Sequence, residues 1–170
     1  MADLEKQMVL DALTRFEPYV RAADTDIALL EKPNYVEREA LVDSLQITLD
    51  PGQSLAPSSA IALLQQASGW RVTLNAVHRQ AAMYSNKLAS LVVELENIWA
   101  SLAPYNSRYE NQVIIGVRMQ EIRRRATDAA THATYCEAAY WSIQRTCDNI
   151  NSLALLYDKA GLMGPPVNPG

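Results

Sequence analysis

The sequence predicts an all-α protein built on a long antiparallel helical hairpin, coiled-coil-like, with short N-terminal helices packed on it. Apolar residues recur at alternating spacings of three and four through two long segments, and a proline-containing turn separates those segments. In addition, 49% of the 170 residues are hydrophobic, which is enough for a packed core in a chain of this length. We therefore divide the chain into an N-terminal region (1–57), the hairpin (58–160) and a tail (161–170).

The N-terminal region is acidic and contains two helical patterns. It holds eleven Asp and Glu against five Lys and Arg, a net charge of −6, whereas residues 58–170 have a net charge of +2. Apolar spacing predicts one helix near 3–16, and Asn34 followed by Glu37 predicts the start of another near 35–45. Each is expected to be about three turns long. The opposite charges allow the two regions to dock, within one chain or between neighbours, although two ordinary solvated surfaces are the simpler interpretation.

The first long helix is predicted to begin at residue 58 and to end near residue 102. Steps of four and three residues from Trp70 meet ten positions, none of them charged. They are Trp70, Leu74, Val77, Ala81, Tyr84, Leu88, Leu91, Leu95, Ile98 and Leu102. An alternation kept for more than four heptads is typical of a coiled-coil seam. Gly69 is a point at which this helix could break or bend.

The second long helix is predicted to extend to residue 160. The same steps from Gln112, the one polar member, meet Ile115, Met119, Ile122, Ala126, Ala129, Ala133, Cys136, Tyr140, Ile143, Cys147, Ile150, Ala154 and Tyr157. Because this seam lasts more than six heptads, we expect a helix approaching about 70 Å in length.

Residues 103–107 are predicted to form the turn between the long helices. Pro104 disfavours helical conformation at the residue before it, and Ser107 with Glu110 has the spacing of a capping box that starts the next helix. A turn of a few residues makes the two helices antiparallel. With a pivot near residue 105, Tyr84 is expected to face Ala126, in a run of alanines that leaves room for the ring.

Apolar residues away from the two seams need other partners. They include Leu63, Val92, Val93, Val113, Ile114, Val117, Leu153 and Leu156. The short N-terminal helices cannot cover them all, so we expect other copies of the chain, or other proteins, to cover the remainder. The tail, rich in proline and glycine, is expected to be extended.

Common catalytic motifs are missing from the sequence. It contains no P-loop, dinucleotide-binding glycine motif, G-x-S-x-G, H-E-x-x-H or paired C-x-x-C, and it lacks the E-x-x-H pairs of di-iron helical bundles. We therefore expect no enzyme, no cofactor and no small-molecule substrate. The longest uncharged stretch, 51–70, contains Pro57 and several polar residues, so no membrane span is expected. The N-terminus also lacks the pattern of a signal peptide, which favours a cytoplasmic location or one inside an assembled particle such as a virion.

His78, His132, Asp128 and Cys136 are the candidate ligands of a metal site. His78 and His132 satisfy the predicted facing relation, and Asp128, His132 and Cys136 lie four residues apart on one helical face. However, Cys136 is a seam residue, for which a small buried thiol is the ordinary interpretation, so no metal is expected. Cys147 would lie roughly 16 Å from Cys136 along the same helix, too far for a disulfide.

A cluster of basic residues is the candidate contact for an acidic protein surface or for nucleic acid. Its members are Arg118, Arg123, Arg124 and Arg125, with Lys87 nearby across the hairpin. Three consecutive helical residues fan over about 200°, and Glu121 is placed to pair with Arg124 or Arg125. The chain has only four lysines and a pI near 5.2. A solvated face, or a contact with an acidic region of another subunit, is therefore favoured over nucleic acid.

The C-terminal helix also bears on nucleic acid. Tyr140, Trp141, Ile143 and Cys147 on their long helical background resemble the end of the UvsY-type phage recombination mediators, over about a tenth of the chain. Those proteins are small and helical, form rings and load recombinase onto single-stranded DNA. The resemblance implies a nucleic-acid-handling helical oligomer.

The leading prediction is a non-enzymatic structural or assembly subunit. It would self-associate through the outer faces of its helical hairpin and join other proteins, as a component of a viral particle or of another large complex. The alternative is the nucleic-acid-handling oligomer described above, which would use the basic cluster. A metalloprotein with ligands at His78 and His132 is a distant third.

Overall fold

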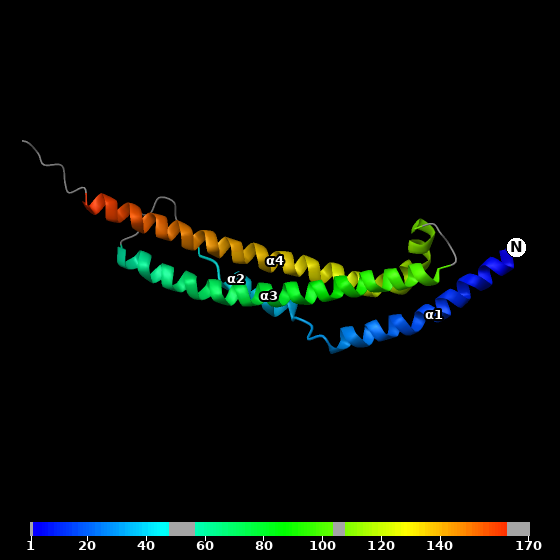
Figure 1. The fold of residues 1–170 in the computed structure, drawn as a ribbon. Helices are drawn as coiled ribbons and strands as arrows, with labels where there is room; N and C mark the ends of the chain where they lie inside the picture. Colours follow the sequence, from blue (N-terminus) through cyan, green and yellow to red (C-terminus); the bar gives the residue numbers. More distant parts are fainter. Residues whose placement is uncertain (1, 48–56, 104–107, 163–170) are drawn as a thin grey trace, which may run out of the picture. The chain divides into compact units, whose positions relative to one another are not determined.

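The computed structural model describes residues 2–47, 57–103 and 108–162, which form four helices and no strand (Figure 1). These helices are α1 (Ala2–Leu29), α2 (Tyr35–Ser44), α3 (Pro57–Leu102) and α4 (Arg108–Leu162). The predicted all-α class is confirmed. Of the turn predicted at 103–107, residues 104–107 lie outside the described residues, as does the tail from residue 163. Gly161 and Leu162, assigned to the tail, are the last residues of α4.

The chain divides into two compact units, each with its own N-terminal helix. Unit 1 comprises Met1–Pro33 and Gln80–Ala133, and unit 2 comprises Asn34–Arg79 and Thr134–Gly170. In unit 1 the later part of α3 packs with the earlier part of α4, and in unit 2 the earlier part of α3 packs with the later part of α4. Because α3 and α4 pair in reverse order along the chain, they form an antiparallel hairpin, as predicted.

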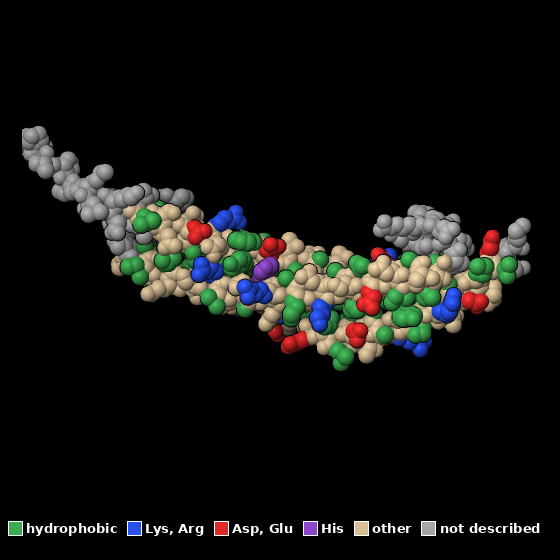
Figure 2. Space-filling view, viewed as in Figure 1, with side chains coloured by type: hydrophobic (Ala, Val, Ile, Leu, Met, Phe, Trp, Pro, Cys, Tyr) green, Lys and Arg blue, Asp and Glu red, His purple; other side chains and the backbone are tan. Residues whose placement is uncertain are grey.

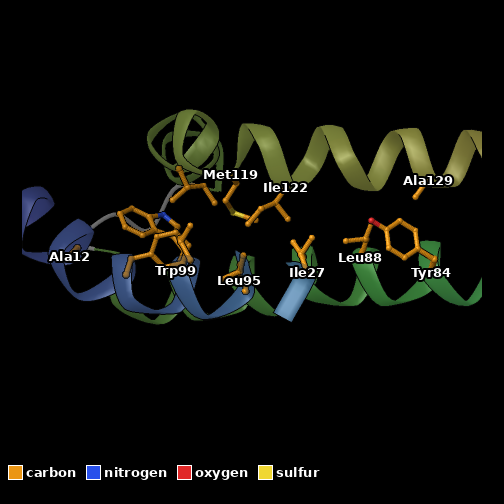
Figure 3. Close-up of a cluster of buried hydrophobic side chains, with 13 residues drawn as sticks. Ala12, Ile27, Tyr84, Leu88, Leu95, Trp99, Met119, Ile122 and Ala129 are labelled. Carbon is orange, nitrogen blue, oxygen red and sulfur yellow. The ribbon is translucent and has the colours of Figure 1, made fainter. Parts of the chain in front are cut away.

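Unit 1 has a three-helix core (Figure 3). α1 contributes one face at helical spacing, formed by Ala12, Phe16, Val20, Ala23 and Ile27. α3 contributes Tyr84, Leu88, Leu95 and Trp99, and α4 contributes Ile115, Met119, Ile122 and Ala129. In Figure 3, Ala129 lies across from Tyr84 and Leu88, which places a small side chain opposite larger ones.

The first N-terminal helix is much longer than predicted. The sequence predicted about three turns near 3–16, but α1 continues for 28 residues with Pro18 inside it. A proline in a helix interior removes one backbone hydrogen bond and normally ends or kinks the helix. Here Val20, Ala23 and Ile27, all beyond the proline, are buried in the core of unit 1. Burial of these three side chains outweighs the lost hydrogen bond.

Unit 2 is built around α2 and the remaining parts of α3 and α4. Its buried side chains are Val42 of α2, Ala60, Ala67 and Leu74 of α3, and Ile143, Cys147 and Ile150 of α4. α2 begins where the sequence predicted, because the side chain of Asn34 accepts a hydrogen bond from the backbone N–H of Glu37 at 3.4 Å. α3 runs through Gly69 without interruption.

The register between the long helices differs from the prediction. In unit 2, Arg71 Nη1 donates to Gln144 Oε1 at 3.2 Å, where the predicted pivot places residue 139 opposite residue 71. His78 stacks on Tyr140, with ring centroids 6.0 Å apart and planes at 11°, instead of facing residue 132. Both partners lie further along α4 than predicted. The prediction assumed that the two helices pair residue for residue from the turn, whereas side-chain packing along them sets the register.

None of the helices, over the residues described, holds a segment with the length and apolar character required to cross a membrane.

Candidate interaction surface

The residues of the two predicted seams line the cores of the two units. On α3, Leu74, Val77, Ala81, Tyr84, Leu88 and Leu95 are buried, and Trp70, Leu91, Ile98 and Leu102 are half-buried. On α4, Ile115, Met119, Ile122, Ala129, Cys136, Ile143, Cys147 and Ile150 are buried, and Ala126, Ala133 and Tyr140 are half-buried. The side chains of Gln112, Ala154 and Tyr157 lie outside the described set. No seam residue whose side chain is described is exposed, so the exposed surface of the helices lies on their other faces.

Trp99 is a core residue that the seam pattern did not include. It follows the seam residue Ile98 and is only 1% exposed, because Phe16 of α1 packs against it. The sequence does contain a signal for it, since Trp99 follows the seam residue Leu95 by four residues and so continues the spacing of the seam. Trp99 lies in the core cluster with residues of α1 and α4.

Two arginines of the basic cluster connect helices within unit 1. Arg118 Nη1 lies 3.6 Å from Glu17 Oε2 of α1, and Arg123 Nη2 lies 2.8 Å from Glu96 Oε1 of α3. Arg118 therefore meets an acidic residue of the N-terminal region of its own chain. The pair of Arg123 with Glu96 again departs from the predicted register, which placed residue 114 opposite residue 96. Lys87, the remaining basic residue proposed for this surface, is exposed on α3.

The other two arginines of the cluster share one carboxylate on α4. Arg124 donates to both oxygens of Glu121, at 2.9 and 2.8 Å, and Arg125 Nε donates to Glu121 Oε1 at 2.8 Å. The predicted pairing of Glu121 is thus confirmed with both arginines. These hydrogen bonds lower the pKa of Glu121 to about 2. Arg124 Nη1 also lies 3.2 Å from Asp128 Oδ2. All four arginines therefore have a carboxylate partner.

The histidines and cysteines do not form a metal-binding group in the part of the chain that the structure describes, where no three or more His, Cys, Asp or Glu side chains are placed to hold an ion. His78 is stacked on Tyr140, and its buried Nδ1 has no hydrogen-bond partner among the described residues. His132 is buried on α4. Cys136 and Cys147 are both buried and are not joined in a disulfide, and burial raises the pKa of Cys136.

A groove of about 600 Å³ lies between α1 and α4 in unit 1. It is lined by Leu10, Leu13, Thr14, Glu17, Pro18, Arg21 and Arg118. Its charged groups pair with each other, because Glu17 lies 3.6 Å from both Arg21 and Arg118. The groove therefore combines the apolar side chains of Leu10, Leu13 and Pro18 with one carboxylate and two guanidinium groups, which leave a net charge of +1.

Large apolar side chains remain exposed on the outer faces of both long helices. Among the residues predicted to need partners, Leu63, Val92 and Ile114 are half-buried, whereas Val93, Val113, Val117 and Leu153 are exposed, and the side chain of Leu156 is outside the described residues. Val72, Met83 and Trp141 are exposed as well. Figure 2 shows hydrophobic side chains interspersed with charged ones on the visible face.

No protein-family model, no characterised protein and no solved structure matches this chain.

Proposed function

We propose that this chain is a non-enzymatic structural or assembly subunit that self-associates through outer faces of its helices. The observation that carries the proposal is the exposure of large aliphatic and aromatic side chains after α1 and α2 have packed on the hairpin. Val117 of α4 is 79% exposed and Val72 of α3 is 68% exposed. Single exposed apolar residues are ordinary on a protein surface, but their recurrence on both long helices favours coverage by further chains.

The ion pairs of the basic cluster favour an assembly role over the handling of nucleic acid. Binding to a phosphate backbone depends on lysine and arginine side chains that are available to replace counterions. Arg118, Arg123, Arg124 and Arg125 each have a carboxylate within 3.6 Å or less. These contacts would have to be broken or shared for phosphate to bind. A particle component, viral or cellular, is the setting that such a subunit would suit.

The oligomeric state of the purified full chain tests the proposal. Sedimentation velocity over a micromolar concentration series should show concentration-dependent association. We expect Val117→Glu to weaken it, because the substitution places a charge in an apolar contact. Gln120→Glu is the matched control, since it adds the same charge to an exposed position one turn away on α4. A wild-type chain that stays monomeric throughout the series contradicts the proposal.

A single-stranded DNA or RNA binding assay at low salt separates the alternative. Tight, salt-sensitive binding that is lost when Arg123, Arg124 and Arg125 are replaced by alanine would favour nucleic-acid handling. Because carboxylates already pair with these arginines, we expect weak binding that the replacements leave unchanged.

A further inference from the structure

α1 carries a second stripe besides the one buried in unit 1. Steps of four, three, four, four and three residues from Leu4 meet Leu4, Met8, Asp11, Arg15, Tyr19 and Ala22. All six side chains are exposed. At about 100° per residue they lie within an arc of roughly 80°, which is the narrow stripe of a two-helix contact. Met8 and Tyr19 are each 48% exposed, and Leu4 is 68% exposed, so three large side chains of this stripe are uncovered.

The contacts of α1 within its own chain leave this stripe unused. Glu17, which reaches Arg118 of α4, lies roughly half a turn around α1 from it. Asp11 accepts a hydrogen bond from Gln7 of the same helix at 2.9 Å. Arg15 has no ion pair with any residue that the structure describes. Glu17, the acidic residue two positions further along α1, pairs with Arg21 instead.

The stripe is complementary to itself when reversed. If two copies of α1 lie antiparallel with residue 13 at the centre, Asp11 of each copy faces Arg15 of the other. Met8 then lies next to Tyr19, a favourable pairing of a thioether with an aromatic ring, and Leu4 lies opposite Ala22. Every contact occurs twice, as a two-fold interface requires. A parallel arrangement would instead bring each Asp11 against Asp11 and each Arg15 against Arg15.

We propose that two copies of this chain form a two-fold dimer by antiparallel pairing of this α1 stripe. The charge order of the stripe selects a second copy as the partner, because the aspartate and the arginine each meet their opposite only in the reversed helix. From Leu4 to Ala22 the contact extends along about 27 Å of helix. The inference rests on the self-association in the proposed function and names one surface through which it occurs.

Charge reversal tests the pairing directly. In Asp11→Arg or Arg15→Asp alone, like charges face each other twice per dimer, so we expect the dimer dissociation constant to rise at least about tenfold. The double variant Asp11→Arg/Arg15→Asp restores opposite charges and should return the constant close to the wild-type value. Asp24→Arg is the matched control, because it makes the same charge change at an exposed position on the far side of α1. Sedimentation equilibrium gives the constants, and circular dichroism verifies that each variant is folded.

The outcomes separate this inference from the proposed function. If the wild-type chain associates but both single variants associate equally well, the α1 pairing is overturned and the proposed function stands. Weakening in the single variants without recovery in the double variant also overturns the pairing. If the wild-type chain is monomeric, both fail. Met8→Glu, which keeps Asp11 and Arg15 but places a charge in the contact with Tyr19, should weaken the dimer as well; unchanged association would contradict that contact.

Discussion

Phe16 of α1 meets Trp99 of α3 edge to face, with ring centroids 5.3 Å apart and ring planes at 68°. Both rings are 1% exposed. Phe16→Ala should therefore lower the free energy of unfolding by about 3–5 kcal/mol, since it leaves a cavity where an aromatic side chain was fully packed. Urea denaturation followed by tryptophan fluorescence measures the loss. Phe16→Leu, which keeps most of the volume, should lose clearly less, and equal losses in the two variants would contradict this packing.

Gly69 in the interior of α3 offers a stabilising substitution. A Cβ atom added there would meet nothing within 4 Å, so Gly69→Ala gains helix propensity without a clash. We expect the free energy of unfolding to rise by about 1 kcal/mol. Gly69→Pro should instead lower it by about 3 kcal/mol. Both are read from urea denaturation midpoints, and destabilisation by alanine would indicate that α3 is bent or broken at this residue.

Glu121 should make the stability of unit 1 sensitive to acid. Hydrogen bonds from Arg124 and Arg125 lower its pKa from 4.5 to about 2. A carboxyl whose pKa is lower in the folded chain stabilises the fold above its unfolded pKa and loses that contribution on protonation. The difference in stability between wild type and Glu121→Gln should therefore be present at pH 7 and should shrink as the pH falls from about 4.5 to 2. Glu94→Gln, at an exposed glutamate of α3 with no arginine partner among the described residues, is the matched control.

Tyr135 should make unit 2 sensitive to alkali. Its hydroxyl donates to Asp43 Oδ1 of α2 at 2.6 Å, and this hydrogen bond is the main cause that raises its pKa to about 12. Because the pKa of Tyr135 is higher in the folded chain, its hydrogen bond stabilises the fold fully below pH 10, and this stabilisation is lost as the pH rises from about 10 to 12. Tyr135→Phe should cost about 1 kcal/mol at pH 7, and the difference from wild type should vanish over that alkaline range. A difference that does not depend on pH would contradict the hydrogen bond.

Cys136 and Cys147 should be protected from thiol reagents in the folded chain. Both side chains are buried, at 0% and 3% exposure, and burial raises the pKa of Cys136, which lowers its thiolate fraction. A bulky aromatic disulfide reagent should react with neither until denaturant is added. Ser90→Cys, at an exposed position of α3, is the positive control and should react at once. Rapid reaction of the wild-type protein would contradict this burial.

The sequence predicted the features that depend on local patterns. The alternating apolar residues of the long helices and the Asn34 cap of α2 are visible along the chain, because periodicity and capping involve residues a few positions apart. The length of α1 was not predictable from its own residues, since Pro18 argues against a continued helix and only burial of Val20, Ala23 and Ile27 against distant segments overcomes it. Register likewise depends on packing between helices, as the stacking of His78 on Tyr140 illustrates.

The ion pairs of the arginine cluster likewise divide into local pairs, which the sequence predicted, and pairs between helices, which it did not. The pairing of Glu121 with Arg124 and Arg125 followed from spacing on one helix turn. The partners of Arg118 and Arg123, which are Glu17 and Glu96, lie far away in the sequence and required the fold. A basic cluster recognised from sequence is therefore a poor indicator of nucleic-acid binding until its carboxylate neighbours are known.

The composition of unit 1 has a consequence for biosynthesis. α1 is made before α3 and α4, but its apolar face is completed by residues of α4 up to Ala129. At ordinary translation rates, on the order of 10 s pass between the emergence of Phe16 and that of its last core partners. During that interval the nascent chain exposes Phe16, Val20 and Ile27 to the cell, so chaperone contact with the ribosome-bound chain should be concentrated on α1.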